Sequence, residues 1–220
     1  MKSNQWVNLM GENPHHYFAS KGALLYGPPG CGKKLLAQAI ARECDMGYVN
    51  VSVSELLEGH VRGSMTKIPQ FFDEVRRAGP CVVVLDKLEY ISQIEKSIKD
   101  STARAQWTAA RDVLLREIDK SDSNTDRRVF FIGVSTNPSL VEDSFIAKGS
   151  RRLEKIIYVP QPDLQARHRI IKLALGNSLV NFKLDILAKC TDKFSGADLV
   201  KLCSNARNRA ITQFYDQAKE

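Results

Sequence analysis

The chain has 220 residues, of which 43% are hydrophobic and 26% charged, and its 32 basic and 25 acidic residues give a formal net charge of +7. This composition is typical of a globular protein with one domain, or one domain and a small appendage, and it excludes a largely disordered chain. No apolar run is long enough to span a membrane, and the polar first residues lack the apolar stretch of a secretory signal peptide.

Short β-rich runs alternate with helical stretches along the first 160 residues. We expect five strands, at 22–26, 48–53, 81–85, 129–134 and 156–159, and helices between them at 33–44, 66–78 and 102–118. The alternation predicts βαβ units and a mostly parallel five-stranded sheet. The runs CVVVL and VFFIGV are apolar throughout, as expected for strands covered on both faces in a three-layer α/β core. The polar segments 93–102 and 119–128 predict exposed loops.

The strands stop after the sequence Pro160-Gln161-Pro162, and the rest is expected to be all-helical, with helices at 164–175, 184–190 and 196–215. We therefore expect an α/β core over residues 1–160 and a small helical lid over residues 161–220. Ser195 is the expected N-cap of the last helix, and Asp198 occupies the capping-box position.

A glycine-rich loop follows the first expected strand directly and precedes a helix. It has the G-x-x-x-x-G-K spacing of a phosphate-binding loop, in which backbone N–H groups surround a phosphate. The helix N-terminus and a lysine add positive charge. The alternative is a structural glycine turn. The residues that would bind the phosphates are Gly27, Pro28, Pro29, Gly30, Cys31, Gly32 and Lys33.

The residue after this motif departs from the pattern. Ser or Thr is expected there, because its hydroxyl binds Mg²⁺, but the chain has Lys34, whose ammonium has no lone pair. Asp86 ends the third expected strand, where nucleoside-triphosphatases hold Mg²⁺ through water. A helix N-cap or a turn is the alternative role for Asp86. ATP or ADP is thus the expected ligand, with Mg²⁺ in doubt.

Lys87 follows Asp86, at the position where hydrolytic enzymes of this kind usually have a glutamate that activates water. A general base contributes about 10²–10⁴-fold in rate, and a protonated lysine cannot act as one. Glu89 lies two positions further on and could take over the role only if its side chain reaches back to the end of the strand.

Five motifs in order resemble the AAA subfamily of AAA+ ATPases: GALLYGPPGCGKKLLAQAIAREC, PCVVVLDKLEYI, STNP, IIYVPQPD and KFSGADLVKLC. The sequence is most similar to the second ATPase domain of valosin-containing-protein-type unfoldases, with degenerate catalytic motifs. Peroxisomal and other type II AAA proteins are near alternatives. The resemblance extends from Lys21 to Ile211.

The resemblance implies a P-loop core with a helical lid, packed with itself or related AAA subunits in a ring that is usually a hexamer. Nucleotide would bind between core and lid, with Lys34 and Leu35 completing the phosphate loop. Asn137 falls at the position of the polar sensor of the γ-phosphate. Gly196 and Ala197 match the lid turn near the base and ribose. Arg151 and Arg152 are candidate arginine fingers for a neighbouring subunit.

The family carries an aromatic residue after the second strand, which grips a polypeptide in the central pore. This chain has Gly59, His60 and Val61 there, with His60 at the aromatic position. An ordinary exposed loop histidine is the alternative. Protein substrates or adaptors are the partners that the resemblance implies.

The five cysteines form no C-x-x-C pair, which predicts reduced thiols in an intracellular protein, cytoplasmic or nuclear, and argues against disulfides or a zinc site. The positive charge raises nucleic acid as a partner. The arginine pairs are scattered, without interleaved aromatic residues or a recognised reading motif, which argues against nucleic acid. They are Arg76-Arg77, Arg127-Arg128 and Arg151-Arg152.

Three functions remain open. The first is an ATP-binding but hydrolysis-deficient AAA+ module in a ring-shaped protein-remodelling assembly, in which Lys34 supplies part of the charge of Mg²⁺. The second is an active unfoldase or segregase with a non-standard site. The third is a basic nucleic-acid-binding protein. In a stronger form of the first hypothesis, Lys34 pairs with Asp86 and closes the site, so that binding is lost as well.

Overall fold

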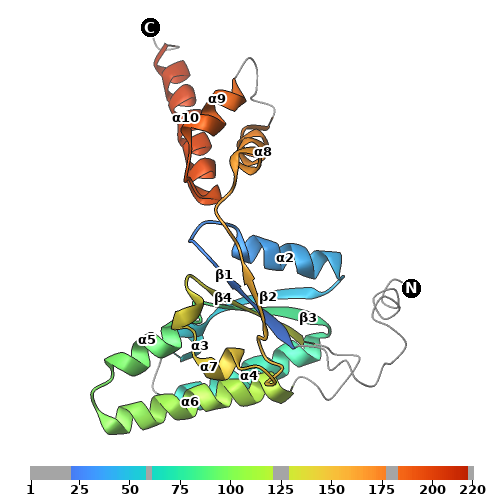
Figure 1. Cartoon of the computed structure of the whole chain (residues 1–220), viewed down its shortest axis with the longest axis vertical. Coiled ribbons are helices and arrows are strands. Elements are labelled where there is room, and N and C mark those ends of the chain that lie inside the picture. Colours follow the sequence, from blue (N-terminus) through green and yellow to red (C-terminus); the bar gives the residue numbers. More distant parts are fainter. Residues whose placement is uncertain (1–20, 58–60, 121–128, 177–182, 218–220) are drawn as a thin grey trace.

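The structure is a computed structural model, and it describes residues 21–57, 61–120, 129–176 and 183–217. Its centre is a sheet of five strands in the order β2-β3-β4-β1-β5 (Figure 1). Every neighbouring pair is parallel. The strands are β1 (Gly22–Tyr26), β2 (Gly47–Ser52), β3 (Cys81–Asp86), β4 (Val129–Ser135) and β5 (Lys155–Tyr158). The expected number and type of strands are confirmed, and their ends differ from expectation by one residue at most.

Helices cover both faces of the sheet, as parallel strands require for their crossover connections. Helix α2 (Lys33–Glu43) lies on one face, and the other helices of the core lie on the opposite face (Figure 1). They are α3 (Val53–Leu57), α4 (Val61–Ala78), α5 (Tyr90–Ser97), α6 (Ser101–Asp119) and α7 (Asp143–Ile146), together with the 3-10 turn η2 (Pro138–Leu140). The three-layer α/β core is confirmed.

The expectation of an exposed loop over residues 93–102 is wrong for most of that segment. Helix α5 continues to Ser97, and α6 begins at Ser101. The reason is a sparse apolar stripe: Ile91 is fully buried, and Ile94 and Ile98 pack against the core. The indole N–H of Trp107 also donates to the carbonyl oxygen of Ile91 over 3.3 Å. The polar residues between these isoleucines make the helical spacing hard to recognise in the sequence. Of the second expected loop, residues 121–128 lie outside the described part of the chain.

Two apolar clusters hold the sheet between its helices. The larger cluster fills the space between the sheet and α4 to α6, and it contains the fully buried Phe131 of β4 and Leu114 of α6. The smaller cluster lies beneath α2, where Ala37 and Ala41 are fully buried four residues apart. These two small side chains share one helix face and let α2 approach the sheet closely. The first residue of α2, Lys33, is thereby fixed at the carboxyl end of β1.

Three helices form the lid: α8 (Leu164–Leu175), α9 (Leu184–Cys190) and α10 (Gly196–Gln217). They extend away from the core and pack around Ile171, Ala188, Leu199 and Cys203 (Figure 1). The buried Arg167 of α8 connects this helix to α9 and to the segment before α8. Its guanidinium donates to the carbonyl oxygens of Ala188 and Pro162. None of the described helices is long and apolar enough to cross a membrane.

The predicted capping box at the start of α10 is confirmed. The Ser195 backbone N–H and hydroxyl donate to Asp198 Oδ2 over 3.0 and 2.7 Å. The Asp198 backbone N–H donates to Ser195 Oγ over 3.3 Å. These bonds lower the pKa of Asp198, because they favour its ionised form. The aspartate, although shorter than the usual glutamate, therefore completes the reciprocal cap.

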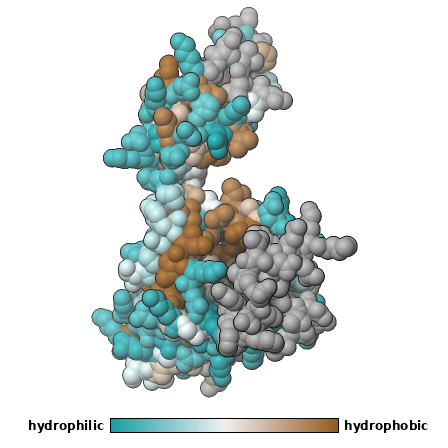
Figure 2. Space-filling view, turned by 45° about the vertical axis from the view of Figure 1, so that its right-hand side comes forward, coloured by the Kyte–Doolittle hydropathy of each residue, from teal (hydrophilic) through white to brown (hydrophobic). Residues whose placement is uncertain are grey.

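Apolar side chains gather on the surface of the core just below the lid (Figure 2). The edge strand β5 contributes to the exposed apolar surface of the chain, because Ile156, Ile157 and Tyr158 are each about half exposed. The first turn of α2 adds Leu35 and Leu36.

Candidate functional site

The glycine-rich loop connects β1 to α2 through backbone conformations that residues other than glycine rarely adopt. Gly27, Gly30 and Gly32 have φ angles of 143°, 75° and 85°. At Gly27 a Cβ atom would also lie 2.2 Å from the carbonyl oxygen of Val159, which leaves no room for one. The loop shape therefore depends on glycine at these positions.

The side chain of Lys33 folds back onto the start of this loop. Its buried ammonium donates to the carbonyl oxygens of Gly27 and Pro28 over 2.6 and 2.8 Å. Burial lowers the pKa of Lys33, and the neighbouring Cys31, Glu89 and Asp86 oppose that shift. A cation is thus held at the centre of the loop, where a phosphate group could replace the two carbonyl oxygens as its partner.

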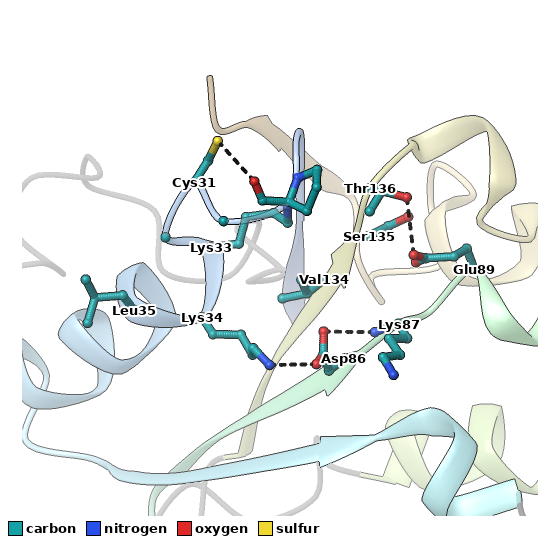
Figure 3. A pocket seen from close by; sticks show the side chains of 13 residues that line it. Cys31, Lys33, Lys34, Leu35, Asp86, Lys87, Glu89, Val134, Ser135 and Thr136 are labelled. Atoms are coloured by element: carbon teal, nitrogen blue, oxygen red, sulfur yellow. Dashed lines mark hydrogen bonds and ion pairs between the residues drawn. The ribbon is translucent and has the colours of Figure 1, made fainter. Parts of the chain in front are cut away.

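The order of the strands brings the loop together with the ends of β3 and β4. Tyr26 at the end of β1 pairs with Ser135 of β4, and Gly133 of β4 pairs with Leu85 of β3. A cavity of about 390 Å³ lies at this edge of the sheet (Figure 3). Its lining is Pro29, Gly30, Cys31, Gly32, Lys33, Lys34, Leu35, Asp86, Lys87, Glu89, Val134, Ser135 and Thr136. Most of the expected phosphate-binding residues and Asp86 therefore share one cavity.

Each carboxylate oxygen of Asp86 already accepts one hydrogen bond from nitrogen. Lys34 Nζ lies 2.8 Å from Asp86 Oδ2, and the backbone N–H of Lys87 donates to Asp86 Oδ1 over 3.0 Å (Figure 3). The Lys34 side chain is 51% exposed and that of Asp86 is 16% exposed. The hydrogen bond to Asp86 raises the pKa of Lys34. The ion pair suggested by the sequence is present, and the cavity remains open beside it.

These residues do not fit the Mg²⁺ ion that the fold would lead one to expect. Magnesium needs oxygen ligands with available lone pairs, and the position of the usual hydroxyl ligand carries the ammonium of Lys34. Both oxygens of Asp86 already accept from nitrogen.

Two side chains near the end of β3, those of Lys87 and Glu89, lie where a general base would be needed. Lys87 lines the cavity with its backbone at a φ of 57°. Glu89 reaches the same cavity, where its Oε1 accepts from the Thr136 hydroxyl over 3.3 Å (Figure 3). The second oxygen of Glu89 is buried and has no hydrogen-bond partner among the described residues. Among the described residues, Glu89 therefore has one carboxylate oxygen paired with Thr136 and one that is buried and unpaired.

Ser135, the last residue of β4, and Thr136, which follows it, line the cavity directly before the expected sensor Asn137. The side-chain oxygen of Asn137 accepts from the backbone N–H of Ser139 over 2.9 Å and caps η2. Asn137 is absent from the lining of the cavity. Neither Ser135 nor Thr136 was expected at the site, although two polar residues directly after an apolar run are a usable signal.

The first turn of the lid helix α10 rests on the phosphate loop. The backbone N–H of Ala197 donates to the carbonyl oxygen of Gly30 over 3.0 Å. A Cβ atom at Gly30 would lie 2.5 Å from Ser195 Oγ. Gly196 and Cys31 line a second cavity, of about 530 Å³, with the linker that joins core and lid. Gly196 and Ala197 thus lie beside the loop.

Arg152, a candidate arginine finger, is bound within its own chain. Its Nε and Nη2 donate to the two carboxylate oxygens of Asp119 over 2.9 and 2.6 Å. Its Nη1 donates to the carbonyl oxygen of Ser144 over 2.5 Å. The backbone N–H of Arg151 donates to Glu154 Oε1 over 2.8 Å. All three guanidinium nitrogens of Arg152 therefore have partners at the end of α6 and in α7.

We expect the pair of Asp119 and Arg152 to make stability depend on pH below about 4. Hydrogen bonding by Arg152 lowers the pKa of Asp119, so the stabilisation is complete above the unfolded pKa of about 3.9 and is lost as the pH falls through the folded pKa. Asp119→Asn should be less stable than the wild type at pH 7, with the difference shrinking toward pH 3. Urea unfolding between pH 7 and 3 measures this. In an Arg152→Gln background the same substitution should cause no pH-dependent difference; a difference that stays constant with pH would contradict the expectation.

The proposed pore loop falls largely outside the described part of the chain. Gly59 and His60 are not described, and Val61 is the first residue of α4. Helix α4 therefore begins five residues before the expected position, Thr66.

Residues 23–161 match the protein family described as "ATPase family associated with various cellular activities (AAA)". The chain belongs to the AAA family of ATPases. Residues 181–220 of this AAA chain match the family described as the AAA+ lid domain. A curated relative, named "Putative cell division cycle ATPase" from Plasmodium falciparum (isolate 3D7), is 37% identical over 196 residues. The match covers 88% of this chain and 15% of that relative, so the AAA chain spans a small part of its relative's length. The family implies nucleotide binding.

Proposed function

We propose that this AAA domain binds ATP or ADP in the cavity between the glycine-rich loop and Asp86, and that it hydrolyses ATP very slowly. The observation that carries the proposal is the contact of Lys34 Nζ with Asp86 Oδ2 at 2.8 Å, beside a lysine at the usual position of the base. The loop keeps its glycines and the buried Lys33, whereas lysines occupy the usual positions of the metal-binding hydroxyl and of the base.

Nucleotide binding is supported by the loop and by the lid. The loop presents the buried ammonium of Lys33, and the N-terminus of α2 adds partial positive charge. The cavity behind Gly196 adjoins the loop through Cys31, which lines both cavities. Phosphates in the first cavity and the nucleoside in the second would place the ligand between core and lid.

Slow hydrolysis is supported by two separate features. Lys87 replaces the carboxylate that would take a proton from water, so the contribution of a base, about 10²–10⁴-fold, is lost. Arg152 is held by Asp119 and Ser144, and extending it into a neighbouring site would first break those bonds. Each feature alone lowers the rate, and both act in the same direction.

The proposed role is that of a nucleotide-binding subunit in a ring of AAA subunits, its own copies or related ones, which acts on protein substrates through adaptors. The likeness to the second ATPase domain of valosin-containing-protein-type unfoldases supports this role. His60 would be the residue that contacts the polypeptide. Because the curated relative is far longer than the matched segment, the role of a whole protein does not follow from the domain alone.

An active ATPase is the second candidate, and Glu89 favours it. Its carboxylate lines the cavity, and one of its oxygens is buried without a partner among the described residues. If Glu89 accepts the proton of the attacking water, turnover would fall into the ordinary enzymatic range. Glu89→Gln would then abolish turnover while leaving nucleotide binding intact.

Calorimetric titration with ATP and ADP, paired with steady-state phosphate release, tests the proposed function. We expect saturable binding of both nucleotides and turnover far below about 1 s⁻¹, the low end of typical enzymes. Lys33→Ala should weaken binding by roughly ten- to a hundredfold, because it removes a charge-assisted contact. Absence of saturable binding would overturn the proposal. Turnover near 1 s⁻¹ that Glu89→Gln abolishes would establish the second candidate instead.

A further inference from the structure

Three ammonium groups and two carboxylates line the phosphate cavity. The ammoniums belong to Lys33, Lys34 and Lys87, and the carboxylates to Asp86 and Glu89. These five side chains together carry one net positive charge before any ligand enters. A nucleoside triphosphate brings several negative charges, and the family normally balances them with a divalent cation. This cavity already contains two cations beyond the lysine of the loop motif.

The position of Lys34 decides how that balance is reached. Its Nζ lies 2.8 Å from Asp86 Oδ2, and its side chain projects from the first turn of α2 toward the end of β3 (Figure 3). A divalent cation that approached Asp86 would meet a positive charge already in contact with the carboxylate, and it would gain no ligand from the ammonium. Metal binding at Asp86 therefore requires the loss of an ion pair, and the lysine offers no compensation.

A phosphate group faces the opposite situation. The Lys34 side chain is 51% exposed and long, so its ammonium can turn from Asp86 to a phosphate oxygen without unburying apolar surface. Asp86 keeps the backbone N–H of Lys87 at 3.0 Å when this happens. An anionic ligand can thus replace Asp86 as the partner of Lys34, whereas a cation has to displace Lys34 from Asp86.

We propose that this site takes the metal-free form of its nucleotide, with the ammonium of Lys34 in place of Mg²⁺. The inference rests on the proposed function, because it concerns the same site, and it names the chemical form of the ligand: a nucleoside polyphosphate without a divalent cation. Mg²⁺ in solution then competes with the protein for the nucleotide. Mg²⁺ also lowers the negative charge that Lys33, Lys34 and Lys87 attract.

Calorimetric titration of the full chain with ATP, once in excess EDTA and once with Mg²⁺ in excess over ATP, tests the inference. We expect the dissociation constant in EDTA to be equal to or lower than that in Mg²⁺. Lys34→Thr, which restores a hydroxyl, should reverse the order and bind ATP roughly tenfold or more weakly in EDTA than in Mg²⁺. Lys172→Thr is the matched control, because it removes the same charge from an exposed position on lid helix α8. It should keep the wild-type order.

The outcomes separate this inference from the proposed function. Wild-type binding that requires Mg²⁺ overturns the inference and leaves nucleotide binding standing. No binding under either condition overturns both. Metal-free binding that persists unchanged in Lys34→Thr overturns the assignment to Lys34. Circular dichroism and thermal unfolding of each variant establish that a change in affinity does not arise from a loss of fold.

Discussion

Replacing Lys87 by glutamate and Lys34 by threonine in one chain is expected to raise the rate of ATP hydrolysis by about 10²–10⁴-fold in the presence of Mg²⁺. Glu at position 87 supplies a carboxylate that can take the proton of the attacking water. Thr at position 34 removes the ammonium from Asp86 Oδ2 and restores a hydroxyl that can bind the metal. Steady-state phosphate release at saturating ATP, with and without Mg²⁺, measures the gain.

Single variants show which substitution matters. Lys87→Gln removes the positive charge without adding a base, so it should recover little of the rate. Lys87→Glu alone should recover less than the double variant, because Lys34 still occupies Asp86. A double variant that binds MgATP but turns over no faster than the wild type would show that another missing group, such as a free arginine finger, limits hydrolysis.

Phe131→Ala is expected to lower the free energy of unfolding by about 3–5 kcal/mol, as truncation of a buried phenylalanine usually does. Phe131 is fully buried in β4, between its neighbours β1 and β3. Its ring lies 5.8 Å from that of Phe72 in α4, measured between centroids. The expected loss is a large part of the total stability of an ordinary domain, about 5–15 kcal/mol. Urea unfolding followed by circular dichroism measures it.

Phe130→Ala is the matched control, because its side chain is the same and its position differs by one residue. Phe130 is partly buried and packs against the smaller cluster beneath α2. Alternation along the strand places the two rings on opposite faces of the sheet. The loss for Phe130→Ala should be distinctly smaller. Equal losses for the two variants would contradict the assignment of the main core to the face covered by α4 and α6.

Much of the fold could be predicted because its signals are local. The apolar runs of β3 and β4 identify buried parallel strands, and the spacing of Gly27, Gly32 and Lys33 identifies the loop. The proximity of Asp86 to the loop also follows, since parallel strands end at the same edge of the sheet. The capping box of Ser195 and Asp198 lies within four residues and is equally readable.

The features that could not be predicted depend on contacts distant in sequence or on a single residue of register. The polar surroundings of Ile91, Ile94 and Ile98 hide a helix that only its contact with the core stabilises. The end of β4 decides whether Thr136 or Asn137 reaches the cavity, and an apolar run does not fix its own last residue. The carboxylate that binds Arg152 belongs to Asp119, 33 residues earlier in the chain, and no local pattern connects them.

The hydrogen bond from the Ala197 N–H to the Gly30 carbonyl oxygen joins two parts of the chain that are far apart in sequence. A bond of this kind is worth about 0.5–1.5 kcal/mol net, which is one to three times the thermal energy at room temperature. It helps to hold the first turn of α10 against the loop, and it can be broken at modest cost. A ligand that turned the Gly30 peptide would break this hydrogen bond. Occupancy of the loop would then be coupled to the position of the first turn of α10.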